Sequence, residues 1–121
     1  MKTIIAGTRT INDPTIVAEA IAAAGWKITE VVSGCASFVD SIGEQWGVDH
    51  RVPVARFPAE WRRFGKSAYL YRNQRMAEYA EALIVILDCE SSRTKDMIDR
   101  ARKMKLPIYI HRVDAGVSSR S

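Results

Sequence analysis

Cysteine, histidine and long apolar runs are scarce in this chain of 121 residues. The two cysteines, Cys35 and Cys89, form neither a disulfide framework nor a metal-ligand pattern, and the two histidines accompany no nucleophile motif. The longest apolar run, 82–87, is far too short to cross a bilayer. A Walker loop and a Gly-x-Ser-x-Gly elbow are also missing. The sequence therefore predicts no metal site, no membrane partner and none of the common catalytic sets, and its catalytic residues stay unknown.

The start of the chain and its composition point to a cytoplasmic domain. Lys2 leads directly into a strand pattern, without the apolar region of a signal peptide. The length fits one domain, which we expect over residues 1–112, followed by a flexible tail at 113–121. The net charge is +4, with twelve arginines against six lysines. Arginine suits contacts with phosphate or carboxylate, but this charge is too small to establish nucleic-acid binding.

Apolar runs alternate with helix patterns along the chain. Strands are expected at 3–6, 30–33, 53–57, 82–88 and 106–110. Helices are expected between the Asn12-Asp13-Pro14 cap and Gly25, and at 37–48, 67–79 and 94–105. Residues 58–66 are predicted to be a long loop. Strict alternation predicts the α/β class: a single Rossmann-like domain with a five-stranded, mainly parallel sheet, helices on both faces, and 82–88 as the central strand.

Polar residues follow three of the predicted strands, at 6–10, 33–40 and 88–94. The carboxyl ends of parallel strands border a crevice into which the N–H groups of the next helices point. Ser, Thr, Gly and Arg at these junctions predict a pocket for a phosphorylated ligand, with Arg9, Gly34 and Ser91 around one concavity. The predicted ligand-binding residues are Gly7, Thr8, Arg9, Ser33, Gly34, Asp40, Arg72, Asn73, Ser91 and Thr94.

Several of these residues have a structural alternative. Gly7 and Gly34 are expected to provide tight turns. Asp40 either meets the dipole of its helix or binds a ribose hydroxyl, and the two alternatives stay open. Ser91 and Thr94 either cap the last helix or hold an anion. Asn73, a poor helix former, is expected to make a polar contact.

Dispersed motifs in a fixed order carry a family resemblance. They are Ile5-Ala6-Gly7-Thr8-Arg9-Thr10, Val31-Val32-Ser33-Gly34, Phe57-Pro58-Ala59 with Trp61, Gly65-Lys66, Arg72-Asn73, and Ser91 with Thr94-Lys95. Together they resemble the YspA/YpsA-related branch of the SLOG superfamily. The resemblance implies a Rossmann-type module that binds nucleotide-derived ligands. Relatives include phosphoribohydrolases that activate cytokinins, sensor domains of antiphage systems and DNA-processing protein A, which binds single-stranded DNA.

The chain departs from that branch at several glycines. The branch usually reads Ser-Gly-Gly-Ala-Arg-Gly-Val-Asp where this chain has residues 33–40, so Cys35 and Phe38 replace glycines. Tyr69 and Arg93 also stand where the branch has glycine. We expect Phe38 and Arg93 to occupy space that these glycines leave open. The hydrolases' Pro-Gly-Gly-x-Gly-Thr-x-x-Glu segment is not matched.

These observations predict a non-catalytic or weakly catalytic protein that binds a nucleotide-derived or other phosphorylated small ligand and needs no cofactor. One alternative is an N-glycosidic hydrolase acting on a nucleoside monophosphate, with Asp40 or Asp96 as its carboxylate. Another is binding of single-stranded DNA through Arg62, Arg63 and Lys66. A third is a partner-binding protein whose pocket is closed. The sequence leaves the oligomeric state, including homo-oligomers, open.

Overall fold

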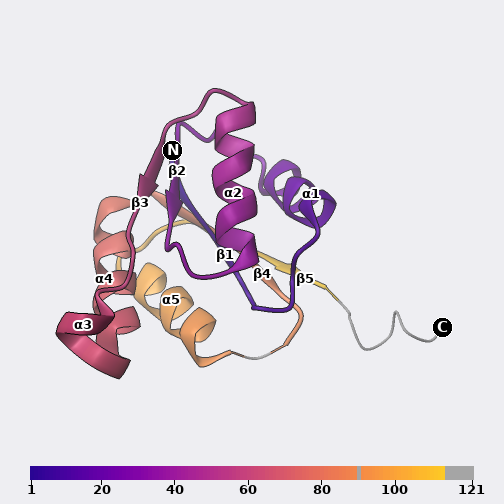
Figure 1. Ribbon diagram of the computed structural model, residues 1–121. Coiled ribbons are helices and arrows are strands. Elements are labelled where there is room, and N and C mark those ends of the chain that lie inside the picture. The colour runs from indigo at the N-terminus through magenta and orange to yellow at the C-terminus, as the bar shows by residue number, and fades with distance from the viewer. Residues whose placement is uncertain (90, 114–121) are drawn as a thin grey trace, which may run out of the picture.

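The computed structural model describes residues 1–89 and 91–113 (Figure 1). Most of the predicted flexible tail therefore lies outside the described residues. Strands and helices alternate from β1 to β5, as the sequence predicts. The elements are β1 (Lys2–Gly7), α1 (Pro14–Ala24), β2 (Glu30–Ser33), α2 (Phe38–Asp49), β3 (Val54–Arg56), α3 (Trp61–Phe64), the 3₁₀ turn η1 (Gly65–Ser67), α4 (Ala68–Tyr79), β4 (Ala82–Leu87), α5 (Ser92–Lys103) and β5 (Ile108–Arg112).

The five strands form one sheet in the order β3-β2-β1-β4-β5, and every neighbouring pair is parallel. This confirms the predicted α/β class, with a sheet that is entirely rather than mainly parallel. Strand β4 lies between β1 and β5, and all of its residues are buried. It is thus an internal strand as expected, although β1 occupies the middle of the sheet.

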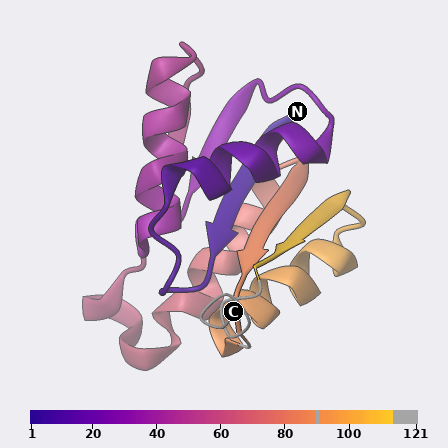
Figure 2. The same cartoon turned by 90° about the vertical axis from the view of Figure 1, so that its right-hand side faces the viewer.

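Helices cover both faces of the sheet, and each face has its own apolar core (Figures 1 and 2). Ile5, Ile84 and Ile86 face α1 and α2, where Val17 and Val39 pack against them. The alternate strand residues, among them Ile4, Leu83 and Val85, face α4 and α5. Successive side chains of a strand point to opposite faces, so a continuous apolar run is buried only where both faces are covered.

Local sequence signals set the helix ends. The Asp13 side chain accepts a hydrogen bond from the Thr15 N–H (2.9 Å), and Pro14 is the first helical residue of α1. Gly25 ends the helix in the left-handed conformation, with a φ of 84°. Among the described helices, none is long and apolar enough to cross a membrane.

The predicted loop at 58–66 is wrong in part, because it contains the helix α3 and most of η1. The Glu60 carbonyl accepts hydrogen bonds from the N–H groups of Arg63 and Phe64. The Phe64 ring stacks on Tyr71 of α4, with centroids 4.1 Å apart. A helix of four residues is too short to produce a periodic pattern, and its packing on α4 is a tertiary contact.

Candidate functional site

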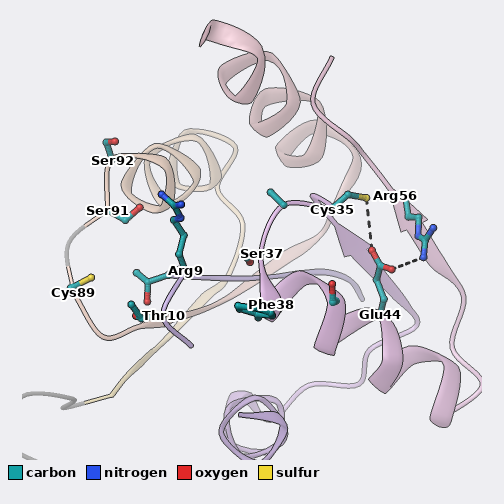
Figure 3. Close-up of a pocket in the computed structure, with 13 residues that line it drawn as sticks. Arg9, Thr10, Cys35, Ser37, Phe38, Glu44, Arg56, Cys89, Ser91 and Ser92 are labelled. Atoms are coloured by element: carbon teal, nitrogen blue, oxygen red, sulfur yellow. Dashed lines mark hydrogen bonds and ion pairs between the residues drawn. The ribbon is translucent and has the colours of Figure 1, made fainter. Parts of the chain in front are cut away.

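Two adjoining hollows lie where β1, β2 and β4 end. The first, the inner cavity, has a volume of about 240 Å³ and is lined by Ala6, Gly7, Arg9, Gly34, Ala36, Ser37, Asp40, Arg72, Asn73, Met76, Ser91, Arg93, Thr94 and Met97. The second, the outer hollow, has about 1130 Å³ and is lined by Thr8, Arg9, Thr10, Cys35, Ala36, Ser37, Phe38, Ser41, Glu44, Arg56, Cys89, Ser91 and Ser92 (Figure 3). Arg9, Ala36, Ser37 and Ser91 line both. Arg9, Gly34 and Ser91 therefore surround one concavity, as their places after three strands predict.

Arg72 places a buried positive charge in the inner cavity. The residue is only 8% exposed, although it lies on α4. Its Nη1 donates to the Gly34 carbonyl (2.6 Å) and its Nε to Asn73 Oδ1 (2.9 Å). Among the described residues, no carboxylate lies within salt-bridge distance of it. Burial lowers the pKa of Arg72, and the charge of Asp40 opposes this effect. A buried cation without an ion-pair partner is costly, and a bound anion would offset that cost.

The two predicted turn glycines allow close packing because they lack a Cβ. A Cβ on Gly34 would lie 2.8 Å from Nη1 of Arg72, and one on Gly7 would lie 2.7 Å from Cγ2 of Val39. Neither glycine has a positive φ, so a left-handed backbone is not what favours glycine at these two positions. The left-handed residue at this junction is Cys35, with a φ of 59°.

Asp40 belongs to a capping box at the start of α2. Its Oδ2 accepts hydrogen bonds from the N–H groups of Ala36 (2.8 Å) and Ser37 (3.1 Å), and its own N–H donates to Ser37 Oγ (3.3 Å). Its Oδ1 forms no hydrogen bond with any described residue. Burial raises the pKa of Asp40, and the two N–H donors and the Arg72 charge oppose that rise. Capping is thus observed, and a contact with a ribose hydroxyl stays a prediction.

Arg9 and Thr8 follow each other in the chain but differ in role. Arg9 is exposed, extends from the end of β1 toward Ser91 (Figure 3), and forms no hydrogen bond or ion pair with any described residue. The buried Thr8 hydroxyl donates to Asp88 Oδ1 (2.7 Å) and accepts from the Asp88 N–H (3.2 Å). Thr10 also donates to Asp88, and the hydrogen bonds from Thr10 and Thr8 hold the pKa of Asp88 below its usual value. Thr8 therefore joins the ends of β1 and β4.

Ser33 lies outside both hollows, unlike the other predicted residues. It is buried, and its hydroxyl donates to Glu44 Oε2 (2.6 Å). Glu44 Oε1 accepts from Arg56 Nη2 at the same distance of 2.6 Å. Glu44 and Arg56 line the outer hollow, and the sequence analysis missed both. Glu44 lies four residues after Asp40 and so on the same helix face, which is the signal that could have indicated it.

Residues at the start of α5 complete the inner cavity. Ser91 is the N-cap and accepts a hydrogen bond from the Thr94 N–H (3.5 Å), so its capping role is observed. The Thr94 residue is 6% exposed, and its hydroxyl forms no hydrogen bond with any described residue. Asn73 Nδ2 donates to Asp96 Oδ2 (3.0 Å). Asp96 also accepts from Arg100 (2.8 Å) and lies outside both hollows, so it serves the packing of α4 against α5.

Two residues that replace glycines of the branch, Arg93 and Phe38, line different hollows. Arg93 lines the inner cavity, and its Cζ lies 5.0 Å from the Tyr69 ring centroid and 5.1 Å from that of Trp61. Two substituted positions, 69 and 93, are thus in contact with each other. Phe38 lines the outer hollow only.

The basic residues proposed for DNA are partly neutralised. Glu60 pairs with Arg63 (3.8 Å) and with Arg75 (3.4 Å), while Arg62 and Lys66 are exposed. In the described part of the chain, no group of His, Cys, Asp or Glu residues is placed to hold a metal ion.

A comparison with protein-family models finds one described as the YspA, cpYpsA-related SLOG family, which matches residues 1–64. That span is more than half of the 121 residues and runs from β1 through α3. The chain belongs to this SLOG family. Neither a curated protein nor a solved structure matches it. The matched residues include the β1 and β2 sides of the two hollows, whereas Arg72, Asn73, Ser91 and Thr94 lie beyond them.

Proposed function

We propose that this SLOG protein binds a phosphorylated, nucleotide-derived small molecule, with the phosphate in the inner cavity. The observation that carries the proposal is the guanidinium of Arg72, which is buried beside the cavity without a carboxylate in salt-bridge distance among the described residues. Folding has placed a charge there whose desolvation the described protein groups offset only in part. A phosphate oxygen would accept from the unused N–H groups of this fork.

The rest of the inner cavity supports an anion. Its charged lining residues are Arg9, Arg72 and Arg93 against the single carboxylate of Asp40. The N-terminus of the twelve-residue helix α5 adds unpaired N–H groups and the positive end of the helix dipole. The buried Thr94 hydroxyl is a further donor at this end. Asp40 Oδ1 supplies an acceptor that fits a ribose hydroxyl rather than a phosphate.

Calorimetric titration with adenosine 5′-monophosphate and the other nucleoside monophosphates tests this proposal. Arg9→Gln removes a charge that holds no described residue in place, so the fold is retained, and we expect affinity to fall about tenfold or more, since a charge-assisted hydrogen bond is worth about 1.5–3 kcal/mol. Arg51→Gln, two residues after the end of α2 and outside both hollows, is the matched control and should leave affinity unchanged. Absence of binding by any nucleoside monophosphate, or equal loss in both variants, would overturn the proposal.

The hydrolase alternative depends on Asp40, since Asp96 is held by Asn73 and Arg100 away from both hollows. Asp40 would have to stabilise or activate groups at the glycosidic carbon. We expect no release of free base from bound nucleotide, because one Asp40 oxygen is committed to the helix cap. Chromatography of the bound nucleotide after prolonged incubation is the test. Base release that Asp40→Asn abolishes would establish the hydrolase instead.

A further inference from the structure

Phe38 is an aromatic side chain left in solvent at the edge of the site. It is the first residue of α2 and is 60% exposed, whereas its neighbour Val39 is fully buried in the core. Its ring lies along the outer hollow, and Figure 3 shows it between Thr10 and Glu44. Because the exposed ring stands beside this hollow, a ligand that enters the hollow would cover it.

The outer hollow continues the inner cavity along one path. Arg9, Ala36, Ser37 and Ser91 line both, so a ligand held by its phosphate at Arg72 extends past Ser37 toward Phe38. Ser37 and Phe38 are consecutive residues at the start of α2. The two spaces therefore adjoin, with the Arg72 cation at one end and the Phe38 ring at the other.

The surroundings of Phe38 identify the kind of group that fits there. Hydroxyls of Thr10, Ser37, Ser41 and Ser92 and the Glu44–Arg56 ion pair make up much of the remaining wall. An acyl chain would exclude water from these polar groups and would offer them no hydrogen bonds in return. A planar heterocycle offers an apolar face to the ring and a polar edge to the hydroxyls.

We infer that Phe38 is the stacking surface for the nucleobase of the ligand, so that the outer hollow is a base subsite. This inference rests on the proposed function, because the phosphate end fixes where the base lies. It assigns Phe38 a role in choosing the ligand: a nucleotide binds through both ends, and a sugar phosphate through the inner cavity alone.

Calorimetry with paired ligands tests the inference. Ribose 5-phosphate probes the inner cavity, and the adenosine, guanosine, cytidine and uridine 5′-monophosphates add a base. We expect at least one nucleotide to bind about tenfold more tightly than ribose 5-phosphate, in line with base–aromatic stacking. Phe38→Leu keeps an apolar side chain of similar size at this exposed position, so the fold is retained, and it should remove most of that difference while ribose 5-phosphate binds as before. Val48→Leu, at another exposed apolar position of α2, is the control.

The outcomes distinguish a failure of the base subsite from a failure of phosphate binding. If ribose 5-phosphate and all nucleotides bind equally, or Phe38→Leu leaves their ratio unchanged, the base subsite is wrong and phosphate binding stands. If Phe38→Leu weakens ribose 5-phosphate as much as the nucleotides, the role of Phe38 is structural and the inference fails. If neither kind of ligand binds the wild-type protein, the proposed function itself is overturned, and the base subsite with it.

Discussion

The guanidinium of Arg72 lies directly against the backbone of Gly34. Its Nη1 donates to the Gly34 carbonyl at 2.6 Å and to no other acceptor among the described residues, and a Cβ on Gly34 would lie 2.8 Å from the same nitrogen. Gly34, the residue after β2, therefore fixes the position of the Arg72 guanidinium, which belongs to α4. This contact holds the buried cation at the inner cavity.

Gly34→Ala should displace Arg72 and weaken nucleotide binding about tenfold, while overpacking lowers the free energy of unfolding by about 1–3 kcal/mol. Gly47→Ala is the matched control, because its Cβ would lie 2.9 Å from Cγ2 of Val54, at the other end of α2. Calorimetry and urea denaturation measure the two effects. Both variants should lose stability, and only Gly34→Ala should lose affinity. Equal affinities in the two variants would contradict the role given to Arg72.

Cys35→Gly should stabilise the protein by about 0.5–1 kcal/mol, because a left-handed residue without a Cβ avoids the steric cost that Cys35 bears at a φ of 59°. The gain is partly offset by the greater freedom of glycine in the unfolded chain. Ala36→Gly, at the next residue and without a positive φ, should destabilise instead. Urea denaturation under reducing conditions compares the two, and a loss of stability in both would show that the Cys35 backbone bears no strain.

Asp40 should make stability depend on pH in a definite direction. Its pKa is raised in the folded state, mainly by burial, so the folded protein holds this proton more tightly than the unfolded chain. The contribution of Asp40 is therefore present below its unfolded pKa and is lost as the pH rises through its folded pKa. Asp40→Asn should gain stability relative to wild type as the pH rises from about 4 to 7. Urea denaturation across that range measures the gain, and a constant difference would argue against the raised pKa.

Asp88 should behave with the opposite sign and serves as the comparison. Hydrogen bonds from Thr10 and Thr8 lower its pKa, so its contribution is present above the unfolded pKa and is lost as the pH falls through the folded one. Asp88→Asn should therefore differ most from wild type at neutral pH and converge with it in acid. The same denaturation series distinguishes the two carboxylates.

Arg93→Leu should loosen α3. This helix has only four residues and no side-chain cap, and Arg93 stacks on both Trp61 and Tyr69. Each stack is worth about 0.5–1 kcal/mol at an exposed site. Hydrogen exchange of the 61–67 amides should become several-fold faster, whereas Arg62→Leu, a basic residue of the same helix without such a stack, should leave it unchanged. Unaltered exchange in Arg93→Leu would show that α3 is held by other contacts.

The sequence by itself determined the elements of this protein and their order. Local signals depend on residues only a few positions apart. They include the alternation of side chains along a strand, the N-caps Asp13 and Ser91, and Gly25 at the end of α1, and the structure agrees with them closely. Because parallel strands joined by helices place their carboxyl ends at one edge, the sequence also predicted the edge at which the two hollows lie. The small helix α3 escaped prediction, since contacts with distant residues hold it, among them Phe64 on Tyr71 and Arg93 on Trp61.

Only the tertiary structure decided what each site residue does. Thr8 and Ser33 look like ligand groups in the sequence, yet their hydroxyls are bound to Asp88 and Glu44. Arg72 and Gly34 are 38 positions apart, and Asn73 and Asp96 are 23 apart. A helix cap involves residues a few positions apart, so a short sequence pattern predicts it. Burial and pairing of a charge depend on which distant segments meet, and only the folded chain brings those segments together.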